Sequence, residues 1–122
     1  MSYDSIIAGA GIWGCTVARR LADVGKNVLV LEKRTFVGGN VRCEIDDETG
    51  IEIHKMREYS AAWKPGDEPY YPIDNTDSRE LLLKYQAEAA TIPNLIVGGR
   101  LGGYKYYDMD RSIDAALELS LV

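Results

Sequence analysis

The sequence has little positive charge, no long apolar run and few cysteines. Its 14 Lys and Arg are outnumbered by 19 Asp and Glu, for a net charge of −5, so it lacks the basic surface that binds nucleic acid or an anionic membrane. No stretch approaches the roughly 18 consecutive apolar residues of a membrane-spanning helix, and the N-terminus lacks the pattern of a signal peptide. We therefore expect a cytoplasmic protein with no nucleic-acid or membrane partner.

Metal ligands and disulfide partners are also scarce. The two cysteines, Cys15 and Cys43, have no C-x-x-C spacing, and we expect both to be small buried side chains. His54 is the single histidine, and no nucleophile or cluster of metal ligands surrounds it at a usable spacing. The sequence therefore predicts no metal site, and it offers no residue that we assign as catalytic.

A glycine-rich turn follows the first apolar run of the chain. The sequence Gly9-Ala10-Gly11-Ile12-Trp13-Gly14 matches the pattern G-x-G-x-x-G, whose first glycine allows a tight turn and whose last allows a helix to pack closely on a strand. The middle glycine lets the backbone approach a pyrophosphate, which a helix N-terminus attracts. The pattern predicts a dinucleotide-binding turn, with a tight turn in another α/β protein as the alternative.

A carboxylate and a basic pair follow the second apolar run. Glu32 ends that run about 20 residues after the glycine turn, where a carboxylate can accept the ribose hydroxyls of a dinucleotide. Lys33 and Arg34 are placed to meet an adenine or a phosphate, and Gly38-Gly39-Asn40 suits another close backbone approach. The alternative is a solvated basic pair before an ordinary turn. The glycine pattern alone leaves NAD and FAD both open.

Helical and extended patterns alternate along the chain. We expect buried strands at residues 3–8, 27–32 and 95–97, helices at 12–24, 77–90 and 110–119, and a hairpin from 41–45 and 51–55. Asp77 should cap the second helix, with Leu81 and Tyr85 facing inward. Residues 57–73 should be loop. The fold class is α/β: a Rossmann-like domain with a small, mainly parallel sheet, helices on both faces and an edge hairpin, burying roughly two thirds of its unfolded surface.

Two groups of segments closely resemble the UDP-galactopyranose mutase family. The sequences GAGIWG (9–14), VLVLEKR (28–34), GGN (38–40) and GIEIHK (50–55) resemble the start of family members. The sequences WKPGDEPYYPI (63–73), VGGRL (97–101) and YKYYDM (104–109) resemble their end. Family members are much longer, and their histidine-containing segment and helical substrate domain have no counterpart here. We therefore expect a single truncated FAD-binding domain, with residues 1–55 and 57–122 joined near Met56.

The resemblance implies a flavin cofactor and a sugar-nucleotide substrate. The family binds FAD and, in galactofuranose biosynthesis, interconverts UDP-galactopyranose and UDP-galactofuranose through N5 of the reduced flavin. By resemblance, the cofactor-binding residues are Gly9, Gly11, Ile12, Trp13, Gly14, Glu32, Lys33, Arg34, Gly38, Gly39, Asn40, Arg100 and Met109. The substrate diphosphate would contact Tyr70 and Tyr104 or Tyr107, although alternation along 104–107 also suits a strand with one core-facing tyrosine.

Three functions remain open from the sequence. The first is an FAD-binding domain of the isomerase family that is inactive alone because its substrate domain is missing. The second is a non-catalytic fragment that binds FAD weakly or not at all and forms homo-oligomers through an exposed sheet edge. The third is an NAD-dependent dehydrogenase domain, which the matches after Gly38 disfavour.

Overall fold

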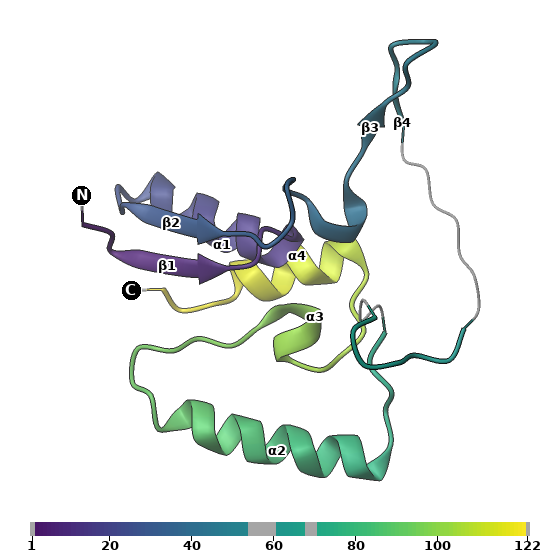
Figure 1. Ribbon diagram of the computed structural model, residues 1–122. Coiled ribbons are helices and arrows are strands. Elements are labelled where there is room, and N and C mark those ends of the chain that lie inside the picture. Colours follow the sequence, from purple (N-terminus) through teal and green to yellow (C-terminus); the bar gives the residue numbers. More distant parts are fainter. Residues whose placement is uncertain (1, 54–60, 68–70, 122) are drawn as a thin grey trace.

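A parallel strand pair and the helix that connects it form the N-terminal part of the fold. The computed structural model describes residues 2–53, 61–67 and 71–121. Strand β1 (Ser5–Ala8) pairs in parallel with β2 (Val28–Leu31), and helix α1 (Ile12–Asp23) connects them (Figure 1). Gly25, at φ +80°, takes the left-handed conformation that ends α1. The predicted βαβ unit is therefore confirmed, with slightly shorter elements.

The core lies between this unit and the last helix. Helix α4 (Met109–Leu117) packs along α1, and this is the most extensive contact between any two elements. Figure 1 shows the two helices side by side. The buried cluster joins Ile7 of β1 and Val17 and Leu21 of α1 to Ala116 of α4. These positions on α1 recur at helical spacing, which directs them to one face. The first and last parts of the chain therefore share one core.

The predicted hairpin forms, but not at the edge of the parallel sheet. Strands β3 (Glu44–Ile45) and β4 (Glu52–Ile53) pair antiparallel in a sheet of their own, which projects away from the α/β unit (Figure 1). Local contacts build its turn, because the Asp46 carboxylate accepts hydrogen bonds from the backbone N–H and hydroxyl of Thr49. Such contacts define a turn without placing it against another element, and the edge position expected for the hairpin is wrong.

The third predicted strand is absent from the described residues. Residues 95–97 pair with no strand, and the short helix α3 (Gly99–Gly102) follows them. Helix α2 (Thr76–Ala90) begins one residue after Asn75, whose side-chain oxygen caps Ser78 N at 2.8 Å, so the N-cap expected at Asp77 is wrong. The described parts of residues 57–73, which are 61–67 and 71–73, contain no helix or strand.

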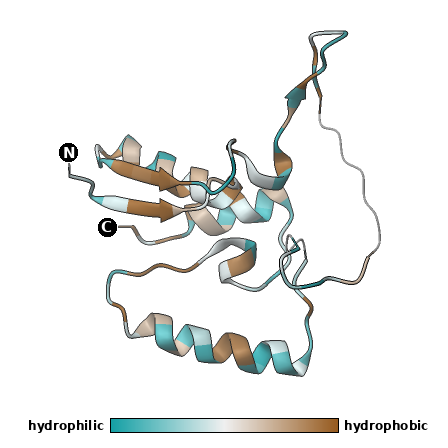
Figure 2. Cartoon of the chain, in the orientation of Figure 1, coloured by the Kyte–Doolittle hydropathy of each residue, from teal (hydrophilic) through white to brown (hydrophobic). Residues whose placement is uncertain are grey.

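Apolar surface is exposed over much of the molecule. Ile6 is 64% exposed, and α2 buries none of its residues, with Leu81 at 52% and Tyr85 at 67%; Figure 2 shows the hydrophobic bands on both β1 and α2. The accessible surface is 10060 Å², whereas a compact monomer of this mass exposes about 6,500 Å². The chain buries about half of its unfolded surface, so the expected burial of two thirds is wrong. The expectations that the strands are fully buried and that Leu81 and Tyr85 of α2 face inward are also wrong.

Neither cysteine is buried, and no helix in the described part of the chain is suited to cross a membrane. Cys15 and Cys43 are both exposed and free, which corrects the expectation of small buried side chains. Among the residues that the structure describes, no helix has the length and apolar character to span a bilayer. The same residues contain no group of three or more His, Cys, Asp or Glu that could hold a metal ion.

Candidate functional site

The glycine turn between β1 and α1 requires glycine at two positions, for a different reason at each. Gly9 has φ +103°, which L residues rarely adopt, and its N–H donates to Leu31 O at 2.7 Å. A Cβ on Gly14 would overlap the Gly9 carbonyl oxygen and would lie 3.4 Å from Ile7 Cγ2. The turn therefore depends on glycine at these positions to bend and to bring α1 against β1, as the motif predicts.

Gly11 occupies the opposite kind of environment. No atom of the described residues lies within 4 Å of where a Cβ on Gly11 would point. Gly11 is also the N-cap of α1, makes no side-chain cap and is followed by no acidic residue in the first turn. The first N–H groups of this 12-residue helix therefore carry a partial positive charge that the N-cap residue does not offset, as phosphate binding requires.

Glu32 lies directly beside this turn. Its Oε2 accepts a hydrogen bond from Ala10 N at 2.7 Å, and its Oε1 accepts one from Arg34 N at 2.9 Å. These backbone hydrogen bonds, that of Arg34 first and that of Ala10 second, hold the pKa of the Glu32 carboxyl below its ordinary value. Each oxygen keeps a second lone pair, which a ribose hydroxyl could use. Glu32 thus fixes the turn, and no sequence motif marks Ala10 as its partner.

The second glycine stretch meets the first. Gly38 donates its N–H to Ala10 O at 2.8 Å, and a Cβ on Gly39 would lie 3.4 Å from Gly11 Cα. Asn40, within the short 3-10 helix Gly39–Val41, accepts a hydrogen bond at its Oδ1 from Arg34 Nη2 at 3.1 Å. The predicted residues around 9–14 and 32–40 are therefore brought to one place. Lys33 is exposed beside them.

Trp13 connects this place to the C-terminal part of the chain. A Cβ on Gly98 would lie 2.7 Å from Trp13 Cε2, and one on Gly99 would lie 3.3 Å from Trp13 Cβ. Trp13 thus packs on glycine backbone, a role that the sequence did not predict for it. Ile12, next to it, is half-buried. The packing brings the segment that carries Arg100 next to the N-terminus of α1.

Arg100 is held by the tyrosine run that follows it. Its Nε donates to Tyr107 O at 2.6 Å, and its guanidinium carbon lies 4.7 Å from the centre of the Tyr106 ring. Tyr104 and Tyr107 are half-buried, and the Tyr104 hydroxyl oxygen accepts a hydrogen bond from Ile73 N at 3.3 Å. Residues 104–107 form no strand, so the strand alternative for this segment is wrong.

Of the two remaining predicted residues, the structure describes Met109 but not Tyr70. Met109 is the first residue of α4 and is 57% exposed. Tyr70 lies outside the described residues, as does the join near Met56.

Tyr106, which the site prediction omitted, contacts Arg100 and has a Tyr71 ring 5.5 Å away, while a hydrogen bond with Asp108 raises the pKa of its hydroxyl. Its place in the YKYYDM segment was the signal for it.

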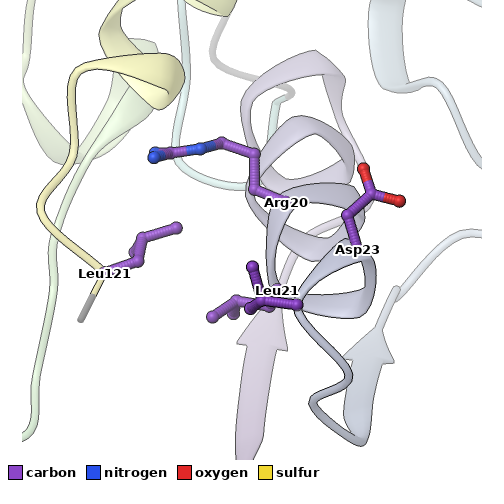
Figure 3. Close-up of a pocket in the computed structure, with 5 residues that line it drawn as sticks. Arg20, Leu21, Asp23 and Leu121 are labelled. Atoms are coloured by element: carbon purple, nitrogen blue, oxygen red, sulfur yellow. The ribbon is translucent and has the colours of Figure 1, made fainter.

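A pocket at the far end of α1 is separate from the glycine turn. It has a volume of about 250 Å³ and is lined by Arg20, Leu21, Asp23, Val24 and Leu121 (Figure 3). Because α1 rises ~1.5 Å per residue, Leu21 is about 15 Å along the helix from Gly11. The pocket is therefore not part of the candidate dinucleotide site.

Comparisons with known proteins agree with this geometry. Residues 44–106 match the family model for UDP-galactopyranose mutase, and residues 7–69 match that for an NAD(P)-binding Rossmann-like domain. The chain is 33% identical over 115 residues to a probable UDP-galactopyranose mutase of Klebsiella pneumoniae, covering 78% of this chain and 30% of the relative.

Two other relatives match the chain over shorter segments. A UDP-galactopyranose mutase of Mycoplasma genitalium is 49% identical over 54 residues, which are 44% of this chain and 13% of the relative. The FAD-dependent oxidoreductase oblC of Cochliobolus heterostrophus is 44% identical over 49 residues, 40% of this chain and 10% of that protein. The chain thus spans 10% to 30% of the length of these relatives. With a family model matching more than half of its residues, the chain belongs to the UDP-galactopyranose mutase family.

Proposed function

We propose that the chain is an FAD-binding unit of this family. The observation that carries the proposal is the meeting of Gly11 and Gly39 beside the uncapped start of α1, because two backbone segments without side chains border the open space there. FAD, rather than NAD, is supported by the family and by a relative named as FAD-dependent. The Rossmann-like match alone supports only a dinucleotide.

The residues fit the parts of such a cofactor in chain order. The N–H groups at the start of α1 and the backbone at Gly11 would hold the pyrophosphate, and Glu32 would accept the ribose hydroxyls. Lys33, Arg34 and residues 38–40 would contact the adenosine and central parts. Arg100 and the uncapped N-terminus of α4 would border the flavin. Bound FAD, once reduced by an external electron donor, would supply the reduced flavin that the family uses to interconvert UDP-galactopyranose and UDP-galactofuranose.

The unit holds a cofactor without a complete substrate site. We propose that residues 1–55 and 57–122 form one truncated domain, joined near Met56, in which Tyr70, Tyr104 and Tyr107 are what is present for a UDP-sugar diphosphate. The small share of its relatives that this chain covers supports the proposal, since it matches 30% of the length of the Klebsiella pneumoniae relative. Isomerisation needs a closed, water-poor sugar pocket with positive charge on the diphosphate, so the unit should be inactive alone.

The visible spectrum of the purified protein tests the proposal. We expect flavin absorbance bands, or their appearance with one equivalent of added FAD, and no turnover of UDP-galactofuranose by the reduced protein. Gly11→Ala should weaken FAD binding at least about tenfold, because its methyl group would occupy the space above the turn. Urea unfolding of the same variant separates a lost site from a lost fold. Colourless protein that ignores added FAD would refute the proposal.

Self-association is a second candidate, and the exposed surface favours it. The surface exceeds that of a compact monomer by about 3,500 Å², whereas a standard protein interface buries about 1,600 Å² in total. Both β1 and β2 have one edge that pairs with no other described strand. Sedimentation at increasing concentration should reveal oligomers that grow with concentration. A monomer throughout that range would rule this candidate out.

A further inference from the structure

Arg20, near the end of α1, binds the end of α4. Its Nη1 donates to Ala116 O at 2.8 Å and to Leu119 O at 2.9 Å, and the side chain is partly buried. Figure 3 shows it extending from α1 across the pocket toward the C-terminal segment. The last carbonyl groups of a helix lack intrahelical partners and carry a partial negative charge, so a guanidinium there stabilises the helix end. The Arg20 side chain thus binds the carbonyl groups at the C-terminal end of α4.

This contact and the packing of Trp13 hold the C-terminal segment at the two ends of α1. Trp13 lies at the start of α1 against Gly98 and Gly99, while Arg20 lies near its end against α4. The end of α1 therefore meets the end of α4, and the two helices run in the same direction, as Figure 1 shows. Both helix N-termini consequently lie at the end of the molecule that holds the glycine turn.

We infer that Arg20 is a positioning residue that sets the N-terminus of α4 relative to that of α1, and thereby sets the affinity for the flavin end of the cofactor. Arg20 touches no part of the dinucleotide site itself, since it lies about 13 Å along α1 from Gly11. The role assigned to Arg20 rests on the proposed FAD site. It adds that the cofactor is held by two separate parts of the chain, whose spacing Arg20 helps to set together with the core contacts between α1 and α4.

The two parts can be probed with two ligands. ADP carries the ribose, adenine and pyrophosphate that the glycine turn and Glu32 would hold, but it has no flavin. FAD adds the part that would lie at Arg100 and α4. Loss of the position of α4 should therefore weaken FAD binding and leave ADP binding unchanged. A general loss of stability would weaken both ligands alike.

The experiment measures FAD and ADP dissociation constants by calorimetry for the full chain and three variants. Arg20→Met removes both hydrogen bonds and should weaken FAD about tenfold, as expected for loss of hydrogen bonds to a charged group, with ADP unchanged within about twofold. Arg20→Lys should restore FAD affinity, because a single nitrogen donates both bonds in the structure. Arg19→Met is the matched control, since Arg19 pairs with Asp23 on the exposed side of the same helix.

The outcomes separate this inference from the proposed function. If the unaltered protein binds neither FAD nor ADP, the dinucleotide site itself is refuted. If it binds both, and Arg20→Met changes FAD and ADP affinity equally or not at all, the positioning role is refuted. An equal effect of Arg19→Met would refute it too. Should Arg20→Met not fold, Arg20→Gln replaces it, and an unchanged ratio of FAD to ADP affinity in that variant overturns the role.

Discussion

Replacing Gly14 with alanine tests the packing that builds the glycine turn. The added Cβ would overlap the Gly9 carbonyl oxygen and press on Ile7 in the core. Alanine inside a helix normally gains ~1 kcal/mol over glycine, while overpacking costs ~1–3 kcal/mol. The overlap is with backbone, which cannot rotate away as a side chain can. We therefore take the upper end of the cost, which leaves a net loss of about 2 kcal/mol in the free energy of unfolding.

Urea denaturation followed by circular dichroism measures this loss. For a domain of this size, ~2 kcal/mol corresponds to a fall in Tm of about 8 °C. Gly11→Ala is the matched control, because the same methyl group there meets no atom of the described residues within 4 Å and the backbone φ of −76° suits alanine. That change should cost at most about 1 kcal/mol, through a weaker helix N-cap.

The pair of variants makes the reasoning refutable. Gly14→Ala should be clearly less stable than Gly11→Ala, although each adds one methyl group three residues apart. If Gly14→Ala matched or exceeded the stability of the unaltered protein, the gain in helix propensity would have prevailed. The close approach of α1 to β1 at this position would then be wrong.

Three further predictions follow from single contacts. Backbone hydrogen bonds lower the pKa of Glu32 from its ordinary value of 4.5, so the free energy of unfolding should fall as the pH drops from 4.5 through the lower pKa of the folded state. Glu32→Gln should reduce this loss of stability in acid, measured by urea unfolding at several pH values. An unchanged dependence of stability on pH would contradict the prediction. Gly98→Ala should displace the Trp13 ring and shift tryptophan emission to the red, whereas an unshifted spectrum would place the ring elsewhere. Asp108→Asn should lower the raised pKa of Tyr106 toward 10.0 in an ultraviolet titration, with Tyr106→Phe identifying the affected tyrosine; a titration curve that Asp108→Asn leaves unchanged would be the contrary result.

Local patterns predicted the N-terminal half of the fold well. Strand β1, helix α1 and strand β2 lie where apolar runs, helical spacing and Gly25 place them, to within two residues. The turn at 46–50 was also predictable, because Asp46 and Thr49 build it from neighbouring residues. Elements of this kind are recognisable because the interactions that define them join residues close in sequence.

Two predictions that needed a distant partner failed. Residues 95–97 have the apolar run of a strand, but no described strand pairs with them, and Ile96 is half exposed. Helix α2 has apolar residues at helical spacing, yet it meets no surface that would bury Leu81. An apolar pattern predicts a face that can be buried, and burial also requires a second surface opposite it.

The sequence by itself determined the glycine turn, the carboxylate after the second strand and the family, because these depend on residue types at short spacings. Tertiary structure alone decided what surrounds them. It put Gly39 against Gly11, assigned the Glu32 oxygens to Ala10 and Arg34, and packed Trp13 on Gly98. It also joined Arg20 to the end of α4, across nearly a hundred residues of chain. Contacts of such separation leave no periodic trace in one sequence, so only the folded chain shows how the candidate site is held together.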